Sequence, residues 1–203
     1  SVQWNYRFHP QFSDGQSRNR NSLPFPALRG AYQLSNAACA LTVLECLNNQ
    51  LPVDIGAIKR GLLLVENPGR FQVLPGRPLV VLDVGHNPHA ARALRRSLIN
   101  LAFAQKRTAV FSMLSDKDID GVLEIVKDQF DEWNIAPLDV PRGMTIEALQ
   151  AKLAEHGIDN VNVFETVAAA YRAALAKATE NDRIVVFGSF HTVADVMAVL
   201  KEH

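Results

Sequence analysis

The sequence of 203 residues lacks the features that mark several large classes of protein. Lys plus Arg and Asp plus Glu both number 21, so no net charge draws the chain toward nucleic acid or an anionic membrane surface. No stretch is apolar over the length that a bilayer requires, and no signal-peptide pattern is present. These absences predict a soluble, cytoplasmic protein, and we expect a monomer that binds neither nucleic acid nor membrane.

Cysteine is nearly absent, with Cys39 and Cys46 as the only two. They lie seven residues apart in a stretch of helical spacing, and two helical turns separate them too widely for a disulfide. We therefore expect two buried free thiols in a reducing compartment. The six histidines are scattered and show no zinc-binding spacing with the cysteines, so no metal site is predicted in this segment.

The short motifs of several common enzyme classes are also missing. The chain has no GxGxxG after a strand, which argues against the usual dinucleotide-binding fold, and no GxxxxGK[ST] phosphate loop. The sequence GSFHT places a serine after a predicted strand but lacks the second glycine of a nucleophile elbow. The segment therefore carries residues that could form part of a site, but it lacks the loop that binds phosphate.

What is present centres on residues 79–101. An unbroken apolar run from Leu79 to Leu82 ends in Asp83 and a glycine turn, and the chain then changes to the apolar spacing of a helix. Asn87 is suited to cap this helix, and Pro88 suits its first position because the missing N–H would be unpaired there. The pattern predicts a buried strand that delivers a carboxylate to its carboxyl end.

Polar residues follow three of the predicted strands. Ligands of open α/β sheets bind beyond the carboxyl ends of strands, so Asp83, His86 and His89 are candidate site residues. An Asp, a Gly and an Asn-Pro after a strand would equally form a sharp turn before a capped helix, and the local pattern leaves both interpretations open. If the three clusters converge at one edge, they form a site for a polar, charged small molecule. The other two clusters are Ser112, Asp116, Lys117 and Asp118, and Ser189, His191 and Thr192.

The order of predicted elements indicates two domains. Residues 1–66 hold one strand, a turn at Asp14-Gly15 with a polar loop to Asn21, and two helices, which is too little for an independent α/β core. From residue 67, short strands alternate with amphipathic helices, which predicts an α/β fold with a mostly parallel, Rossmann-like sheet covered on both faces. The predicted strands are 2–8, 71–74, 79–82, 108–113, 135–138, 161–164 and 183–187, and the predicted helices are 36–47, 54–64, 88–101, 118–133, 145–157, 167–178 and 192–200.

Five short blocks occur together in a characteristic order and approximate spacing. They are GAYQLSNAACAL (30–41), PGRFQ (68–72), LDVGHNPHA (82–90), SMLSDKD (112–118) and GSFHTV (188–193). In these blocks the chain resembles the folylpolyglutamate synthases, and more closely the bacterial bifunctional dihydrofolate synthase/folylpolyglutamate synthases, which are relatives of the Mur ligases. The resemblance extends over almost the whole chain.

This resemblance implies an ATP-dependent amide ligase. In that family ATP phosphorylates a carboxylate of dihydropteroate or of a folate glutamyl tail, and the amine of L-glutamate then attacks the acyl phosphate. The phosphate loop and the Mg²⁺ ligands belong to the amino-terminal ATPase domain of the family. The resemblance therefore implies that residues 1–66 are the tail of that domain and that residues 67–203 are a carboxy-terminal Mur-ligase-type domain. We expect this segment to be inactive without its own ATPase domain.

The resemblance also implies roles for single residues. Asn36 matches the asparagine that meets adenine, Arg70 matches the arginine that reaches ATP phosphate, and Asp83 matches the aspartate on the ribose side. An amide, a guanidinium and a carboxylate each suit the chemistry of that contact. His86 matches a histidine of the same loop and is a candidate catalytic residue near the nucleotide or the incoming glutamate.

Ser189 and His191 match a block on the glutamate side of the family's cleft. Simpler interpretations of two other residues remain open, because Asn36 would also serve as a helix cap and Arg70 as an ordinary linker arginine. Two other functions also remain open. The chain would also suit a non-catalytic α/β ligand-binding module that kept the fold, or a Mur-type ligase acting on cell-wall precursors.

Overall fold

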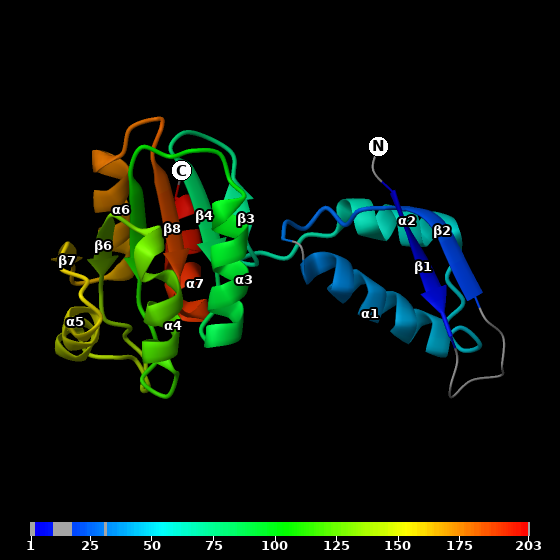
Figure 1. Ribbon diagram of the computed structural model, residues 1–203, viewed down its shortest axis with the longest axis horizontal. Coiled ribbons are helices and arrows are strands. Elements are labelled where there is room, and N and C mark those ends of the chain that lie inside the picture. Colours follow the sequence, from blue (N-terminus) through cyan, green and yellow to red (C-terminus); the bar gives the residue numbers. More distant parts are fainter. Residues whose placement is uncertain (1–2, 10–17, 31, 203) are drawn as a thin grey trace. The chain divides into compact units, whose positions relative to one another are not determined.

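The computed structural model describes residues 3–9, 18–30 and 32–202. The chain separates into two compact units, Ser1–Asn67 and Pro68–His203, called unit 1 and unit 2 below (Figure 1). Each unit has a hydrophobic core of its own. None of the helices in the described part of the chain has the length and apolarity needed to cross a membrane.

Unit 1 is an antiparallel two-stranded ribbon with two helices. Its core is small and contains Tyr6, Leu23, Leu41 and Ile58. Asp54 begins the second helix as predicted, because its carboxylate accepts the Ala57 N–H at 2.9 Å. The elements are β1 (Gln3–Phe8), β2 (Arg18–Pro24), α1 (Tyr32–Cys46) and α2 (Ile55–Leu64).

Strand β2 corrects the prediction of a polar loop that runs to Asn21. Residues 18–21 belong to this strand, which pairs with β1 and with no other strand among the described residues. Within β2 only Leu23 is buried, and Arg18 and Arg20 are half-buried because they pair with the buried Glu45 of α1. No apolar alternation therefore marks the strand. Asp14 and Gly15, where a turn was predicted, lie outside the described residues.

The cysteines of α1 correct a second prediction, because both thiols are free and exposed rather than buried. The buried residues of α1 are Gln33, Ala37, Leu41 and Glu45, which recur at helical spacing. Cys39 and Cys46 lie off that face. Their apolar character therefore gave no guide to their burial.

Unit 2 is built on a six-stranded sheet in the order β3-β4-β8-β5-β6-β7. Strand β3 is antiparallel to β4, and all the other neighbours are parallel, which confirms the predicted mostly parallel α/β fold (Figure 1). The strands are β3 (Gln72–Leu74), β4 (Leu79–Asp83), β5 (Arg107–Phe111), β6 (Glu132–Ile135), β7 (Val161–Val163) and β8 (Arg183–Phe187).

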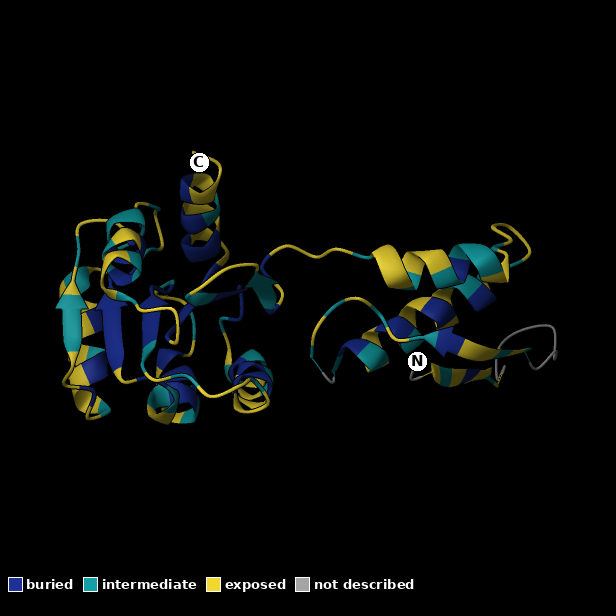
Figure 2. Cartoon of the chain, turned by 90° about the horizontal axis from the view of Figure 1, so that it is seen from above, coloured by how far each residue is buried: buried dark blue, intermediate teal, exposed yellow. Residues whose placement is uncertain are grey.

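Helices cover both faces of this sheet, as Figure 2 shows for unit 2. Side chains of α3, α4 and α5 pack in one core cluster, and side chains of α6 and α7 pack in another. Alternate residues of β4 enter the two clusters, which explains why its sequence reads as one continuous apolar run. The helices are α3 (Pro88–Ile99), α4 (Ile119–Val126), the short 3₁₀ helix η1 (Lys127–Gln129), α5 (Ile146–Glu155), α6 (Val167–Lys177) and α7 (Phe190–Leu200).

The helix predicted over 118–133 is much shorter in the structure. It ends at Val126, and strand β6 begins at Glu132, three residues before the predicted strand 135–138. The misleading residues were Phe130 and Trp133, which fit helical spacing but pack instead against aromatic rings of the sheet. The Trp133 ring meets Phe111 edge-on at a centroid distance of 5.5 Å, and Phe130 stacks on Phe187 at 5.4 Å.

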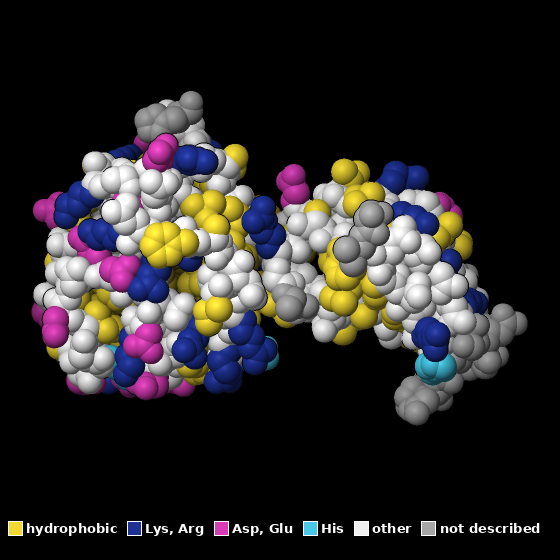
Figure 3. All heavy atoms as spheres, turned by 45° about the horizontal axis from the view of Figure 1, so that its top comes forward, with side chains coloured by type: hydrophobic (Ala, Val, Ile, Leu, Met, Phe, Trp, Pro, Cys, Tyr) yellow, Lys and Arg dark blue, Asp and Glu magenta, His cyan; other side chains and the backbone are white. Residues whose placement is uncertain are grey.

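Charges of opposite sign lie beside one another over much of the visible surface of unit 2 (Figure 3). Arg107 contacts Asp131 at 2.6 Å, and Arg172 contacts Glu202 at the same distance. Figure 3 also shows Lys and Arg side chains gathered at the lower edge of this unit. Such exposed ion pairs contribute little to stability individually.

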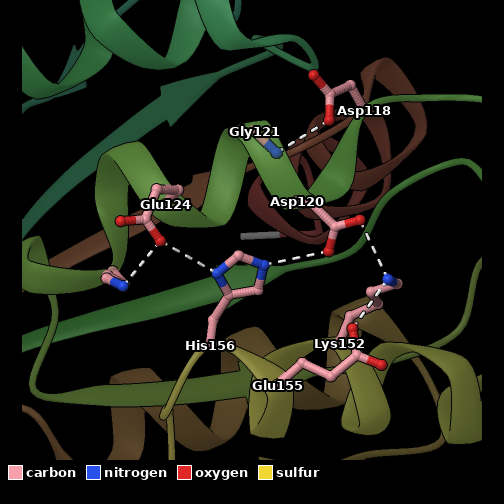
Figure 4. A network of polar contacts seen from close by, with 8 residues as sticks. Asp118, Asp120, Gly121, Glu124, Lys152, Glu155 and His156 are labelled. Atoms are coloured by element: carbon pink, nitrogen blue, oxygen red, sulfur yellow. Dashed lines mark hydrogen bonds and ion pairs between the residues drawn. The ribbon is translucent and has the colours of Figure 1, made fainter.

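His156, which follows α5, fastens α5 to α4 (Figure 4). Its Nε2 lies 3.1 Å from Asp120 Oδ1, and its Nδ1 lies 3.4 Å from Glu124 Oε2. The pKa of Asp120 is lowered most by its hydrogen bond with His156 and next by its hydrogen bond with Lys152. The pKa of Glu124 is lowered mainly by Lys127, with a smaller effect of His156. The network thus joins two helices through charges that favour the ionised carboxylates.

Replacing His156 by alanine is expected to lower the Tm of unit 2 by roughly 2–4 °C at neutral pH, because two polar contacts between α4 and α5 are lost. Carboxylates with a lowered pKa add stability above their unfolded values, and this stability is lost as the pH falls through the folded values. The difference from wild type should therefore begin to shrink as the pH falls below the ordinary pKa values of 3.8 and 4.5, and it should vanish only below the lowered pKa values of the folded protein. Calorimetry at several pH values measures this, with exposed His89→Ala as the control. A variant Tm equal to that of wild type at neutral pH, or a Tm difference that is the same at every pH, would contradict this prediction.

Candidate functional site

The candidate site in unit 2 lies at the carboxyl ends of β4 and β8. These two strands are parallel neighbours, and Asp83 at the end of β4 pairs with Phe187 at the end of β8. The loop that carries His86 and the turn that carries Ser189 therefore start from the same edge of the sheet. This pairing brings the first and the third predicted clusters together. Ser112 of the second cluster lies at the same edge, because β5 is the other parallel neighbour of β8 and the Thr192 hydroxyl donates to the Ser112 carbonyl at 2.9 Å.

Asp83 is buried at this edge, and both of its carboxylate oxygens are engaged by backbone groups. Oδ2 accepts the N–H of Phe71 at 3.0 Å, and Oδ1 accepts the N–H of Gly85 at 2.7 Å. Burial raises the pKa of Asp83, and the two N–H donors and the positive charge of Arg70 oppose that rise. Asp83 therefore ties the segment before β3 to the loop after β4, a contact that spacing along the chain did not indicate.

Arg70 lies between two residues with left-handed backbone. Gly69 has φ +73° and Phe71 has φ +45°, and both are buried while Arg70 is exposed. The Gly69 carbonyl accepts the Val84 N–H at 2.7 Å, and its N–H donates to Gln72 Oε1 at 2.9 Å. The backbone on either side of Arg70 is thus held on the sheet edge, and the guanidinium projects into solvent.

His86 is half-buried in the loop between β4 and α3. Its Nδ1 lies 2.9 Å from the carbonyl oxygen of Val84. A carbonyl can only accept a hydrogen bond, so Nδ1 carries the hydrogen and Nε2 is the acceptor nitrogen of the neutral ring. The ring can therefore receive a proton at Nε2 from a ligand at this edge.

Ser189 and His191 lie where β8 turns into α7. The Ser189 hydroxyl is buried and caps α7 by accepting the N–H of His191 at 3.1 Å. The His191 side chain is exposed on the first turn of that helix. The helix begins two residues earlier than predicted, and Ser189 has a structural use at this edge whatever it binds.

Asn36 lies in unit 1, inside α1, which starts at Tyr32. It is therefore not the cap of that helix, and its amide donates to Gln33 Oε1 at 3.0 Å. Asn36 and Gln33 are polar residues on the wall of a mainly apolar cavity of about 440 Å³ between α1 and α2. A cavity of this size and character suits a small planar ligand with one or two polar edges.

Most of unit 2 matches the sequence model of a known enzyme family. The glutamate ligase domain of Mur ligases matches residues 69–190, which include the loops after β4, β5 and β8. The chain belongs to the Mur ligase family. Among the residues that the structure describes, no group of three or more His, Cys, Asp or Glu side chains is arranged to hold a metal ion.

Several members of the Mur ligase family resemble the chain over both units. Dihydrofolate synthase/folylpolyglutamate synthase of Escherichia coli K12 is 42% identical over 202 residues, which are 98% of this chain and 45% of that protein. The E. coli FolC structure in complex with DHPP and ADP is 39% identical with a TM-score of 0.78, over 95% of this chain and 45% of that chain.

A third relative is a crystal structure of bifunctional folylpolyglutamate synthase/dihydrofolate synthase with Mn, AMPPNP and L-glutamate bound. It is 45% identical with a TM-score of 0.77, and the match covers 91% of this chain and 42% of that chain. The chain thus spans less than half the length of each of these relatives.

Proposed function

We propose that this chain is the carboxy-terminal portion of an ATP-dependent ligase that adds L-glutamate to dihydropteroate and to the γ-carboxylate of folates. The observation that carries the proposal is the 42% identity to dihydrofolate synthase/folylpolyglutamate synthase over 98% of this chain. In this proposal residues 1–66 are the tail of an ATPase domain and residues 67–203 are the Mur-ligase-type domain. A monomer in the cytoplasm is the form in which we expect the ligase to act.

ATP is the proposed cosubstrate, and Arg70 is the residue whose exposure best supports a contact with its phosphates. Its guanidinium is exposed while the backbone on both sides is held, so a phosphate can approach without displacing a protein partner. Asp83 is proposed to face the ribose, in addition to its two backbone contacts, because each carboxylate oxygen can accept a second hydrogen bond. We propose that Asn36 contacts adenine, which the adjoining 440 Å³ cavity of unit 1 would suit.

The reaction that we propose has two bond-forming steps. A substrate carboxylate oxygen attacks the γ-phosphorus of ATP and releases ADP, and the neutral amine of L-glutamate then attacks the acyl carbon and releases phosphate. His86 is placed in the second step, in which Nε2 would accept the proton that the amine loses. Ser189 and His191 are proposed to lie on the glutamate side. Mg²⁺ would neutralise the transferring phosphoryl group, with its ligands outside the described residues.

The proposal predicts that residues 1–203 alone do not turn over. The experiment incubates the purified chain with ATP, Mg²⁺, L-glutamate and dihydropteroate or tetrahydrofolate, and measures ADP and the glutamylated product. We expect neither product, because no phosphate loop is present in this sequence. Sustained turnover by the chain alone would contradict the assignment of its role as one part of a larger site.

A further inference from the structure

Phe190, the first residue of α7, is a large apolar side chain at the candidate site, and 54% of its surface is exposed. Exposed single hydrophobic residues are common, so exposure alone does not indicate a functional role. What distinguishes Phe190 is its neighbours. Its ring lies beside a cation from one segment and an imidazole from another, and both belong to the proposed site.

The two contacts are well defined. The guanidinium carbon of Arg70 lies 5.5 Å from the centre of the Phe190 ring, within the range of a cation–π interaction. The His86 ring lies 5.9 Å from the same ring, with an angle of 49° between the planes. Phe190 therefore joins the segment before β3, the loop after β4 and the start of α7.

The Phe190 backbone is held firmly enough to act as a support. Gly188 takes φ +110°, and Ser189 caps the helix that starts at Phe190. The backbone beside Arg70 is held as well, because Phe71 donates to the buried carboxylate of Asp83. In the described parts of the chain, no ion pair or hydrogen bond involves the Arg70 guanidinium, and its charge acts on Asp83 without direct contact. The ring of Phe190 is the side chain on which the guanidinium packs.

We propose that Phe190 is a positioning residue that holds the Arg70 guanidinium ready for the ATP phosphates, an inference that rests on the proposed function. A free arginine side chain samples many rotamers and must be ordered when phosphate binds. The aromatic face restricts the guanidinium before binding without neutralising its charge or occupying its five N–H donors. The face of the ring, rather than its apolar volume, is what this role requires.

The test uses the complete gene product that carries this chain, with steady-state kinetics for ATP and for L-glutamate. Phe190→Leu keeps an apolar side chain but loses the aromatic face, and we expect it to raise KM for ATP about 2- to 5-fold, the effect of one cation–π contact at an exposed site. The Tm should change little, because Phe190 is exposed. KM for L-glutamate should change less than KM for ATP, because the proposed role acts through Arg70 and the ATP phosphates. Phe190→Trp should restore the wild-type KM for ATP, and Phe103→Leu, at a position 93% exposed, is the matched control.

A double-mutant cycle separates positioning of Arg70 from a general effect at the edge. If Phe190 acts through Arg70, Phe190→Leu should add nothing in an Arg70→Ala background. The inference would be overturned by an equal effect of Phe190→Leu in the wild-type and Arg70→Ala backgrounds, or by a wild-type KM for ATP in Phe190→Leu. In either case, turnover by the wild-type protein would leave the proposed function intact. A wild-type protein without ATP turnover would overturn both.

Discussion

Replacing Arg70 by alanine is expected to lower kcat/KM for ATP by about 100- to 1,000-fold, the range seen when one hydrogen-bond donor that stabilises a transition state is removed. The proposed reaction builds negative charge on the transferring phosphoryl group, and Arg70 is the exposed cation held at the end of β4. Its own exposure predicts a Tm within about 2 °C of wild type. Initial rates with varied ATP, together with a thermal melt, measure both quantities.

Two variants control this prediction. Arg70→Lys keeps the charge but loses the planar fork of donors, so we expect a loss of about 10-fold, between wild type and alanine. Arg92→Ala removes an exposed arginine from α3, outside the proposed contacts, and should leave the kinetics unchanged. Kinetics of Arg70→Ala within threefold of wild type would show that Arg70 is an ordinary linker arginine.

Replacing Gly188 by alanine is expected to destabilise unit 2 by about 3–5 kcal/mol, from backbone strain and overpacking together. The φ of Gly188 is +110°, and an added Cβ would lie 2.4 Å from the carbonyl oxygen of Ser112 and 2.7 Å from the Phe111 ring. Neither neighbour can move easily, because one is backbone and the other is a core ring. A loss of about 10 °C or more in Tm should follow.

Gly157→Ala is the matched control for Gly188. It also has a left-handed backbone, with φ +69°, but no atom lies within 4 Å of the added Cβ. Strain alone should then cost about 1–2 kcal/mol. Chemical denaturation of both variants measures the comparison, and equal losses of stability would show that the close approach to Ser112 and Phe111 has no energetic weight.

Most of the fold of unit 2 was predictable because its local signals agree with its tertiary contacts. The apolar run of β4 is buried on both faces, and the predicted caps at Asn87 and Asp118 accept the N–H groups of Ala90 and Gly121, each at 2.9 Å. The gathering of Asp83, His86 and Ser189 at one edge followed from parallel pairing of strands. These features depend on neighbours in sequence or on a general rule of sheet topology.

The features that escaped prediction depend on contacts between distant residues. Strand β2 has a polar sequence and exists through its pairing with β1. Trp133 joins a sheet in which the rings of Phe111 and Phe187, from two other strands, meet it. At the site, the bond from Phe71 to Asp83 and the stacking of Arg70 on Phe190 join residues 12 and 120 positions apart. No local sequence pattern predicts such pairs, so the contacts that hold Arg70 and its backbone were found only in the structure.

The most direct test of the proposed function measures product formation by the complete gene product that carries this chain. ADP release would be followed with and without L-glutamate, using dihydropteroate and tetrahydrofolate as acceptors, while mass spectrometry counts the glutamate residues added. We expect ADP release that requires both L-glutamate and the acceptor, with one glutamate joined for each ADP. Binding of ATP without ligation would favour a non-catalytic module, and ligation of an amino acid other than glutamate to a cell-wall precursor would favour a different Mur ligase. Either result would contradict the account.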